Sequence, residues 1–209
     1  MFYFIMSSRA RKIGIIILAA GASTRMGQPK QLLEFQGETL IQRIIKTALQ
    51  TECRPIMVVL GAFFNEIKLD IELLVDLKTD IIIVENSAWQ QGMSTSVKIG
   101  LETLLAANPN IEAALFLLTD QPLLTANHLS QITTHTSKTI IASFYNNRPS
   151  VPALFDKKWF PELMQLTGDQ GARKLLALHK AEAHAIPFPE GAFDVDTPEN
   201  YEFLITNFE

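Results

Sequence analysis

The chain has 209 residues, of which 47% are hydrophobic and 19% are charged, which excludes a disordered chain and allows a sizeable core. Its formal net charge of −4 at pH 7 implies no strongly basic face, so nucleic acid is not expected as a partner. The single cysteine, Cys53, excludes an intramolecular disulfide and a multi-cysteine metal site, and it indicates a reducing compartment.

The N-terminus combines a short apolar run with basic residues that follow it, the reverse of the order in a secretory signal. We therefore expect residues 1–11 to form a flexible leader. No window of the sequence reaches the ~18 apolar residues that a membrane span requires. These observations predict a cytoplasmic protein that does not associate with membranes.

Four short apolar runs come next, each nearly continuous and of strand length. They are Ile13–Ala20, Ile56–Leu60, Ile81–Val84 and Ala113–Leu118. Such runs are typical of strands that are buried on both faces of a parallel sheet. Segments with helical periodicity lie between them, at residues 40–49 and 97–105. The alternation predicts a Rossmann-like, three-layer α/β/α fold with a mostly parallel central sheet.

The pattern changes near residue 146, where the segment 146–150 is rich in turn residues. Before this turn the sequence predicts a further strand near residues 139–144, and after it the C-terminal elements. These are strands near residues 151–155 and 183–186, helices near 157–166 and 170–180, and a last helix from Pro198. Because no linker separates this part, we expect residues 12–209 to form a single domain.

The loop after the first strand, residues 21–30, has the composition of a phosphate-binding loop. Its glycines let the backbone approach a phosphate closely, and its N–H groups can form an anion nest. Ser23 and Thr24 add hydroxyl donors, and Arg25 and Lys30 add two positive charges. The spacing differs from a Walker A loop and from the GxGxxG fingerprint. An ordinary strand-to-helix turn is the alternative interpretation.

Aspartates at two places could hold a metal ion. Asp120 follows the fourth apolar run, at the sheet edge where open α/β sheets bind ligands. Asp194 and Asp196 would lie on one face of an extended segment, about 7 Å apart. Mg²⁺ usually takes one or two protein carboxylates and completes its shell with water and phosphate oxygens. The alternative is that these aspartates only cap a turn and a helix.

Six segments then form an ordered set. They are Leu18-Ala19-Ala20-Gly21 through Lys30; Asn86 with Trp89, Gly92 and Ser96; Leu118-Thr119-Asp120-Gln121-Pro122; Pro152–Phe155; Gly168–Arg173; and Asp194–Pro198. Together they resemble the MobA-like nucleotidyltransferases, most closely the molybdenum cofactor cytidylyltransferase branch. The resemblance extends over nearly the whole chain, and it implies a fold like that of the nucleotide-diphospho-sugar transferases.

The resemblance also implies a role for individual residues. It implies a nucleotide-binding half at about residues 12–125 and an acceptor-binding half at about 126–209. The implied catalytic residues are Arg25, Lys30 and Asp120, and the implied metal ligands are Asp120, Asp196 and Asp194. Asp169 and Arg173 would bind the acceptor. The implied nucleotide-binding residues are Leu18, Ala19, Ala20, Gly21, Ser23, Thr24, Arg25, Lys30, Gly61, Asn86, Gly92, Ser94 and Asp120.

The activity that the resemblance implies is Mg²⁺-dependent transfer of CMP from CTP to the phosphate of molybdopterin, with release of pyrophosphate. Ala20 favours CTP, because the cytidylyl branch typically reads Ala-Ala-Gly here and the guanylyl branch Ala-Gly-Gly. Ser150 stands where the family commonly has glycine, which leaves the acceptor open. The alternatives are guanylyl transfer, a sugar or alcohol phosphate as acceptor, or a non-catalytic maturation factor for molybdenum oxidoreductases. A client oxidoreductase would then be a protein partner.

Overall fold

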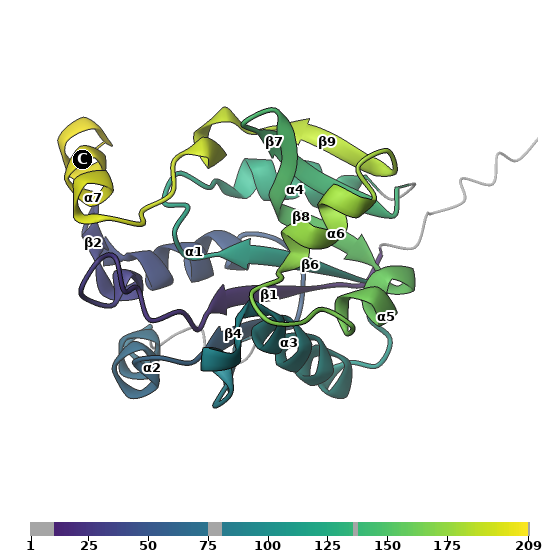
Figure 1. The fold of residues 1–209 in the computed structure, drawn as a ribbon, viewed down its shortest axis with the longest axis horizontal. Coiled ribbons are helices and arrows are strands. Elements are labelled where there is room, and N and C mark those ends of the chain that lie inside the picture. The colour runs from purple at the N-terminus through teal and green to yellow at the C-terminus, as the bar shows by residue number, and fades with distance from the viewer. Residues whose placement is uncertain (1–10, 75–80, 136–137, 209) are drawn as a thin grey trace, which may run out of the picture.

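A seven-stranded sheet forms the centre of the molecule in the computed structural model, which describes residues 11–74, 81–135 and 138–208 (Figure 1). The strand order is β5-β4-β1-β6-β8-β7-β9. The strands are β1 Ile13–Ala19, β4 Ile56–Leu60, β5 Ile81–Glu85, β6 Ala113–Leu118, β7 Ile140–Tyr145, β8 Arg148–Asp156 and β9 Ala183–Pro187. A small separate hairpin pairs β2 Glu34–Phe35 with β3 Glu38–Thr39.

The sheet is parallel except at one strand. β1 pairs in parallel with both β4 and β6, whereas β8 runs antiparallel to both β6 and β7. All seven residues of β1 are buried, because successive side chains of this apolar run enter the cores on opposite faces of the sheet. The predicted mostly parallel sheet is therefore confirmed, and its one antiparallel strand lies in the C-terminal part.

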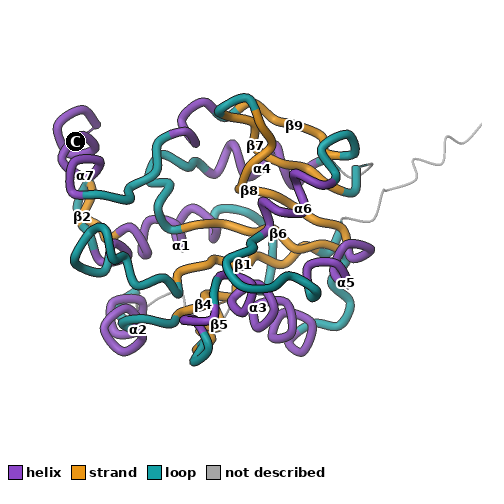
Figure 2. Tube along the Cα trace, viewed as in Figure 1, coloured by secondary structure: helices purple, strands orange, loops and turns teal. Residues whose placement is uncertain are grey.

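Helices cover both faces of the sheet, which gives the predicted three layers (Figure 2). Side chains of α1, α2 and α4 pack with Ile15 and Ile17 on one face, and side chains of α3, α5 and α6 pack with Ile16 and Leu18 on the other. The helices are α1 Leu40–Leu49, α2 Phe64–Glu72, α3 Met93–Ala107, α4 Ala126–Thr134, α5 Phe160–Leu163, α6 Ala172–Leu178 and α7 Pro198–Phe208.

The C-terminal helix α7 packs on the hairpin rather than on the sheet. Leu204 of α7 and Val195, which precedes it, form a small core with Phe35 and Leu40. The hydroxyl of Tyr201 donates a hydrogen bond of 2.8 Å to a backbone carbonyl of the hairpin. This contact brings the segment that carries Asp194 and Asp196 back to the N-terminal part of the chain.

The expected leader, residues 1–11, lies outside the described residues except for Arg11, whose guanidinium pairs with the carboxylate of Asp156. The predicted elements of the C-terminal part are present, with shifted ends. β8 is longer than the expected strand at 151–155, and α6 is shorter than the expected helix at 170–180. Among the described residues, no helix has the length and apolar character needed to cross a membrane.

Candidate active site

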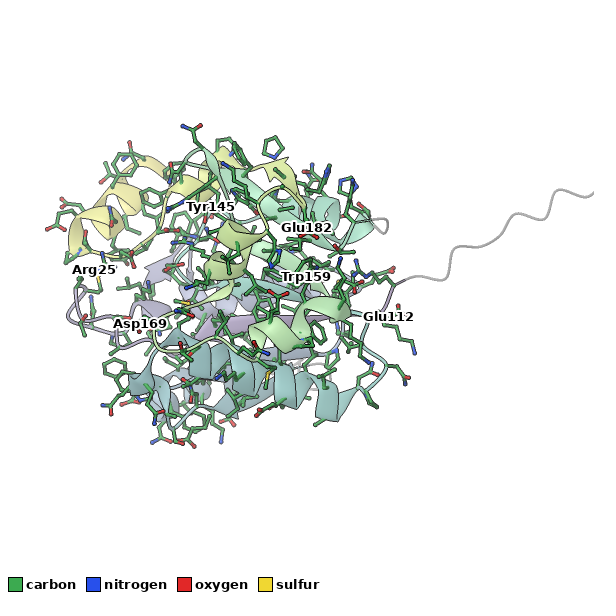
Figure 3. The ribbon with its side chains drawn as sticks, turned by 45° about the vertical axis from the view of Figure 1, so that its right-hand side comes forward. Arg25, Glu112, Tyr145, Trp159, Asp169 and Glu182 are labelled. Atoms are coloured by element: carbon green, nitrogen blue, oxygen red, sulfur yellow. The ribbon has the colours of Figure 1, made fainter. Side chains whose placement is uncertain are left out.

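Two adjoining cavities, of about 390 and 410 Å³, lie beyond the carboxyl ends of β1 and β6. The first is lined by the loop after β1, the turn before α3 and the end of β6. The second is lined by the start of α6 and by the segment before α7. Lys30, Asp120 and Asp169 line both, so the two cavities meet at these side chains. Figure 3 shows Arg25 and Asp169, which come from different parts of the chain, on the same side of the molecule.

Lys30 forms the central ion pairs of this site. Its Nζ atom lies 2.8 Å from Oδ2 of Asp120 and 2.8 Å from Oδ1 of Asp196. Burial alone would lower the pKa of Lys30, but the two carboxylates outweigh this effect and raise it above the usual value. The ammonium group therefore stays charged and holds together two carboxylates that would otherwise repel each other.

Arg25, in the loop of residues 21–30, joins the same network. Its Nη2 atom lies 3.0 Å from Oδ2 of Asp196, while its side chain remains largely exposed. Burial raises the pKa of Asp196, but Lys30 and Arg25 more than compensate, and the pKa lies below the usual value. Asp196 is thus ionised, and it pairs with two cationic side chains that could instead bind the phosphates of a nucleotide.

Asp194 lies in the opposite electrostatic environment. Burial is the main cause that raises its pKa to about 6, and the nearby Asp120 carboxylate raises it further. Arg173 opposes this shift only partly, because its Nη2 atom is 3.7 Å from Oδ2 of Asp194. The Oδ1 atoms of Asp120 and Asp194 are buried and have no hydrogen-bond partner among the described residues. This corner of the site therefore has an excess of negative charge.

The donor set fits a divalent cation, although not one enclosed by three carboxylates. Across residues 11–74, 81–135 and 138–208, no group of three or more His, Cys, Asp or Glu side chains is arranged to hold a metal ion. Instead, Lys30 separates Asp120 from Asp196. The unpartnered oxygens of Asp120 and Asp194 are hard donors of the kind that Mg²⁺ binds one or two at a time. Phosphate oxygens and water would supply the remaining ligands.

Most residues proposed from the sequence do line these cavities. Those in the first cavity are Leu18, Ala19, Ala20, Gly21, Ser23, Thr24, Lys30, Gly92, Asp120 and Asp169. Those in the second cavity are Leu18, Arg25, Lys30, Asp120, Asp169, Arg173, Asp194 and Asp196. The structure thus brings together segments that lie far apart in the sequence, and both aspartate segments reach the same place.

Three residues proposed from the sequence line neither cavity: Asn86, Gly61 and Ser94. The side chain of Asn86 is buried and fully used: Nδ2 donates to the hydroxyls of Thr95 and Ser96, and Oδ1 accepts from a backbone N–H. A Cβ atom on Gly61 would lie 2.7 Å from Cβ of Trp89, so glycine allows that ring to pack closely. Direct contact of these three with a nucleotide stays a prediction.

A contact between two glycines joins the walls of the two cavities. Gly92 has φ of +107°, and a Cβ atom there would lie 2.3 Å from the carbonyl carbon of Gly168. The backbone N–H of Ser94 donates a hydrogen bond of 3.0 Å to the carbonyl of Gly168. The segment before α6, with Asp169, is thereby fixed against the start of α3.

The first cavity is also lined by Trp89, Gln90 and Met93, which lie in the segment 86–96 that the resemblance implies around the nucleotide base but which had no individual role. Thr119 and Gln31 line it too, and the sequence assigned neither of them a role. Gln31 is only 1% exposed, and its amide bonds to the backbone of the phosphate loop. Its position immediately after Lys30 was the one available signal.

The chain is similar to known proteins over most of its length. The sequence matches the family described as "MobA-like NTP transferase domain" over residues 15–185. It is 31% identical over 191 residues to the molybdenum cofactor cytidylyltransferase of Escherichia coli K12, covering 90% of this chain and 93% of that protein. It is 28% identical over 202 residues to the purine catabolism protein PucB of Bacillus subtilis 168, covering 90% and 94%.

The fold is also similar to that of a solved structure, Rv0371c from Mycobacterium tuberculosis H37Rv. The TM-score is 0.79 at 25% identity, and the similarity covers 95% of this chain and all of that one. A second structure of that protein is a complex with manganese.

Proposed function

This chain belongs to the MobA-like NTP transferase family, and we propose that it transfers CMP from CTP to the phosphate of a molybdopterin-type cofactor, with release of pyrophosphate. One observation carries the proposal: two cavities meet at Lys30 and Asp120. A nucleotide in the first cavity and a phosphorylated acceptor in the second would bring their phosphates together at this pair. We assign the nucleotide to residues 12–125 and the acceptor to residues 126–209.

The first cavity has the groups that a triphosphate requires. The loop after β1 offers backbone N–H groups, and Lys30 offers a positive charge. Arg25 adds a second positive charge from the adjoining second cavity. Both cations are paired with carboxylates in the absence of ligand, so phosphates would exchange one anionic partner for another. Lys30 and Arg25 would then neutralise the charge that develops on the departing pyrophosphate.

The reaction requires little covalent chemistry from the protein. The acceptor phosphate oxygen attacks the α-phosphorus, the bond from that phosphorus to the β-phosphate oxygen breaks, and pyrophosphate leaves. Because the attacking phosphate is already ionised, no general base is needed. Asp120, together with Asp194 or Asp196, would hold Mg²⁺, which when bound supplies charge neutralisation at the phosphates. Positioning by the two cavities accounts for the remainder.

The second cavity offers a cation for the acceptor phosphate. Arg173 lines it and is held from behind, because its Nη2 atom donates a 3.3 Å hydrogen bond to the hydroxyl of Tyr145. The same hydroxyl accepts a 2.9 Å hydrogen bond from Gln121. Arg173 can therefore present its remaining N–H groups to a phosphate in a fixed direction.

Two features support CTP and a molybdenum cofactor. Ala20 lines the nucleotide cavity, and we infer that its methyl group would crowd a purine there more than a pyrimidine. The chain is also 31% identical, over 90% of its length, to a protein named as molybdenum cofactor cytidylyltransferase. If this assignment is right, the product would be delivered to a client molybdenum oxidoreductase in the cytoplasm.

A thermal-shift panel with CTP, GTP, ATP and UTP, each with and without Mg²⁺, tests the nucleotide assignment. A ligand at 100 times its Kd stabilises a protein by about 2.7 kcal/mol, which is readily measured. We expect selective, Mg²⁺-dependent stabilisation by CTP. A preference for GTP or ATP would overturn the base assignment and the role given to Ala20.

Pyrophosphate release then tests the acceptor. We expect CTP to be consumed with molybdopterin but not with sugar phosphates or alcohol phosphates. Turnover with one of those phosphates instead would keep the chemistry and change the substrate. Tight nucleotide binding with no pyrophosphate release from any acceptor would favour a non-catalytic maturation factor.

A further inference from the structure

Three successive carbonyl groups, from the last residue of β1 into the loop that follows, accept hydrogen bonds from the body of the protein. The Nε2 atom of Gln31 donates to the carbonyls of Ala19 and Gly21, at 2.8 and 3.0 Å. The carbonyl between them, that of Ala20, accepts from the backbone N–H of Ala62 at 3.1 Å. The oxygen side of this loop is therefore committed to internal contacts.

The N–H side of the same loop has no such partners. Within the part of the chain that the structure describes, the backbone N–H groups of residues 20–25 donate no hydrogen bond. Residues 18–24 border the nucleotide cavity. In a trans peptide the C=O and N–H groups point in opposite directions, so a carbonyl held on one side fixes the next N–H on the other.

We propose that Gln31 is a positioning residue for the triphosphate. By holding the carbonyls of Ala19 and Gly21, its amide turns the following N–H groups, those of Ala20 and Ala22, toward the nucleotide cavity. The amide does this without contributing a charge of its own. This inference rests on the proposed nucleotide site, and it names the side chain that orients the N–H donors of that site.

The chemistry at this position calls for an amide. Two carbonyls require two donated hydrogens, which Nε2 supplies, and Oε1 accepts a 3.3 Å hydrogen bond from the hydroxyl of Ser23. That hydroxyl in turn accepts a 3.2 Å hydrogen bond from the backbone N–H of Lys30. The amide thus links the phosphate loop to the start of the segment that carries the central lysine. Because Gln31 is 1% exposed, water does not compete for these bonds.

Binding of inorganic tripolyphosphate, measured by titration calorimetry, tests the inference without depending on the base or the acceptor. Gln31→Met preserves size but removes both donors, and Gln31→Asn keeps the amide but shortens its reach. The matched control is Gln42→Met, because Nε2 of Gln42 also bonds to a backbone carbonyl, that of Asp70 at 3.2 Å, and lies outside both cavities. Thermal unfolding of each variant is measured in parallel.

We expect Gln31→Met to weaken tripolyphosphate binding by about tenfold or more, as expected for loss of an aligned donor to a charged group. Gln31→Asn should show a smaller loss, and CTP should follow tripolyphosphate. Gln42→Met should lose stability but bind tripolyphosphate as the wild type does. A merely structural role for Gln31 would lower stability without this selective loss.

A folded Gln31→Met that binds tripolyphosphate within about twofold of wild type would overturn the inference and leave the proposed function standing. If Gln31→Met does not fold, unchanged tripolyphosphate binding by Gln31→Asn would likewise overturn the inference. A wild-type protein that binds neither tripolyphosphate nor any nucleoside triphosphate would overturn both this inference and the proposed function.

Discussion

The Nζ atom of Lys30 lies 2.8 Å from Oδ2 of Asp120, and this pair borders both cavities. Oδ1 of Asp120 is buried and has no partner among the described residues. Asp120 can therefore bind a cation through one oxygen while Lys30 keeps the other. In the proposed reaction, the lysine and a metal ion would therefore act together on the same phosphates.

Lys30→Met should lower kcat/KM for the nucleotide by about 100-fold or more, because the charge next to the phosphates is lost. It should also tighten Mn²⁺ binding without nucleotide, since Asp120 and Asp196 would lose their shared cation. Electron paramagnetic resonance measures the free Mn²⁺. Lys46→Met, which breaks a surface pair with Glu38, is the control. Unchanged Mn²⁺ affinity in Lys30→Met would contradict the prediction that Lys30 competes with a metal ion for these two carboxylates.

Asp120→Asn should reduce pyrophosphate release by about 100-fold or more, because an amide binds a divalent cation far more weakly than a carboxylate does. The fold should persist, since Asn can still accept a hydrogen bond from Lys30. Circular dichroism checks the fold, and a pyrophosphate assay measures turnover. Full turnover in this variant would remove the central claim of the proposed function.

Asp194 should make the protein without metal less stable as the pH rises. Its pKa is raised in the folded protein to about 6, mainly by burial, from an ordinary value of 3.8. The carboxyl group of Asp194 therefore binds its proton more tightly in the folded state than in the unfolded state. The resulting contribution to the free energy of unfolding is fully present below pH 3.8 and is lost as the pH rises through about 6. Asp194→Asn should be more stable than wild type at pH 8, with a smaller difference at pH 5. Urea unfolding at both pH values measures this, and a difference that grew at low pH would refute it.

Gly92→Ala should destabilise the protein by more than about 3 kcal/mol, because it combines a φ of +107° with a collision against the backbone of Gly168. Gly168→Ala should cost only about 1 kcal/mol. Its φ is +56°, which is strained for alanine, but a Cβ atom there meets nothing within 4 Å. Urea unfolding compares the two, and equal losses would mean that the collision contributes nothing.

Ala20→Gly should shift nucleotide preference toward GTP by about tenfold relative to CTP, because one methyl group is removed from the cavity wall. The ratio of the two Kd values, rather than either alone, reports this effect. Gly21→Ala adds a methyl group to the same wall where a Cβ atom meets nothing within 4 Å, and it serves as the comparison. An unchanged ratio in Ala20→Gly would place the choice of base elsewhere.

The fold followed from local patterns of the sequence. The run from Ile13 to Ala20 predicted a strand buried on both faces, and β1 is buried throughout. The resemblance to MobA-like nucleotidyltransferases is confirmed by the match over residues 15–185. The antiparallel direction of β8 was not predicted, because the composition of a strand does not indicate whether it runs parallel or antiparallel to its neighbours. Its direction follows from the turn at residues 146–147, which connects it directly to β7.

The sequence was more informative about the charged residues of the candidate site than about its neutral ones. Arg25, Lys30, Asp120 and Arg173 all line the cavities, and their chemical roles stay predictions. Asn86 has the same polar character, but its amide is used up by neighbouring hydroxyls. A sequence shows that a residue carries an amide, but not which groups that amide will hydrogen-bond to. It therefore could not indicate that Gln31 bonds to the loop at the cavity and Asn86 to neighbouring hydroxyls.

The contact between Gly92 and Gly168 bears on how new members of this family can be engineered. Under the proposed division of roles, grafting the C-terminal half of one relative onto the N-terminal half of another is a route to a new acceptor. In such a chimaera, however, the segment at Gly92 would have to fit the segment at Gly168, and the N–H of Ser94 would have to reach the carbonyl of Gly168. A workable crossover therefore transplants residues 92–94 together with residues 168–171, although these segments belong to different halves.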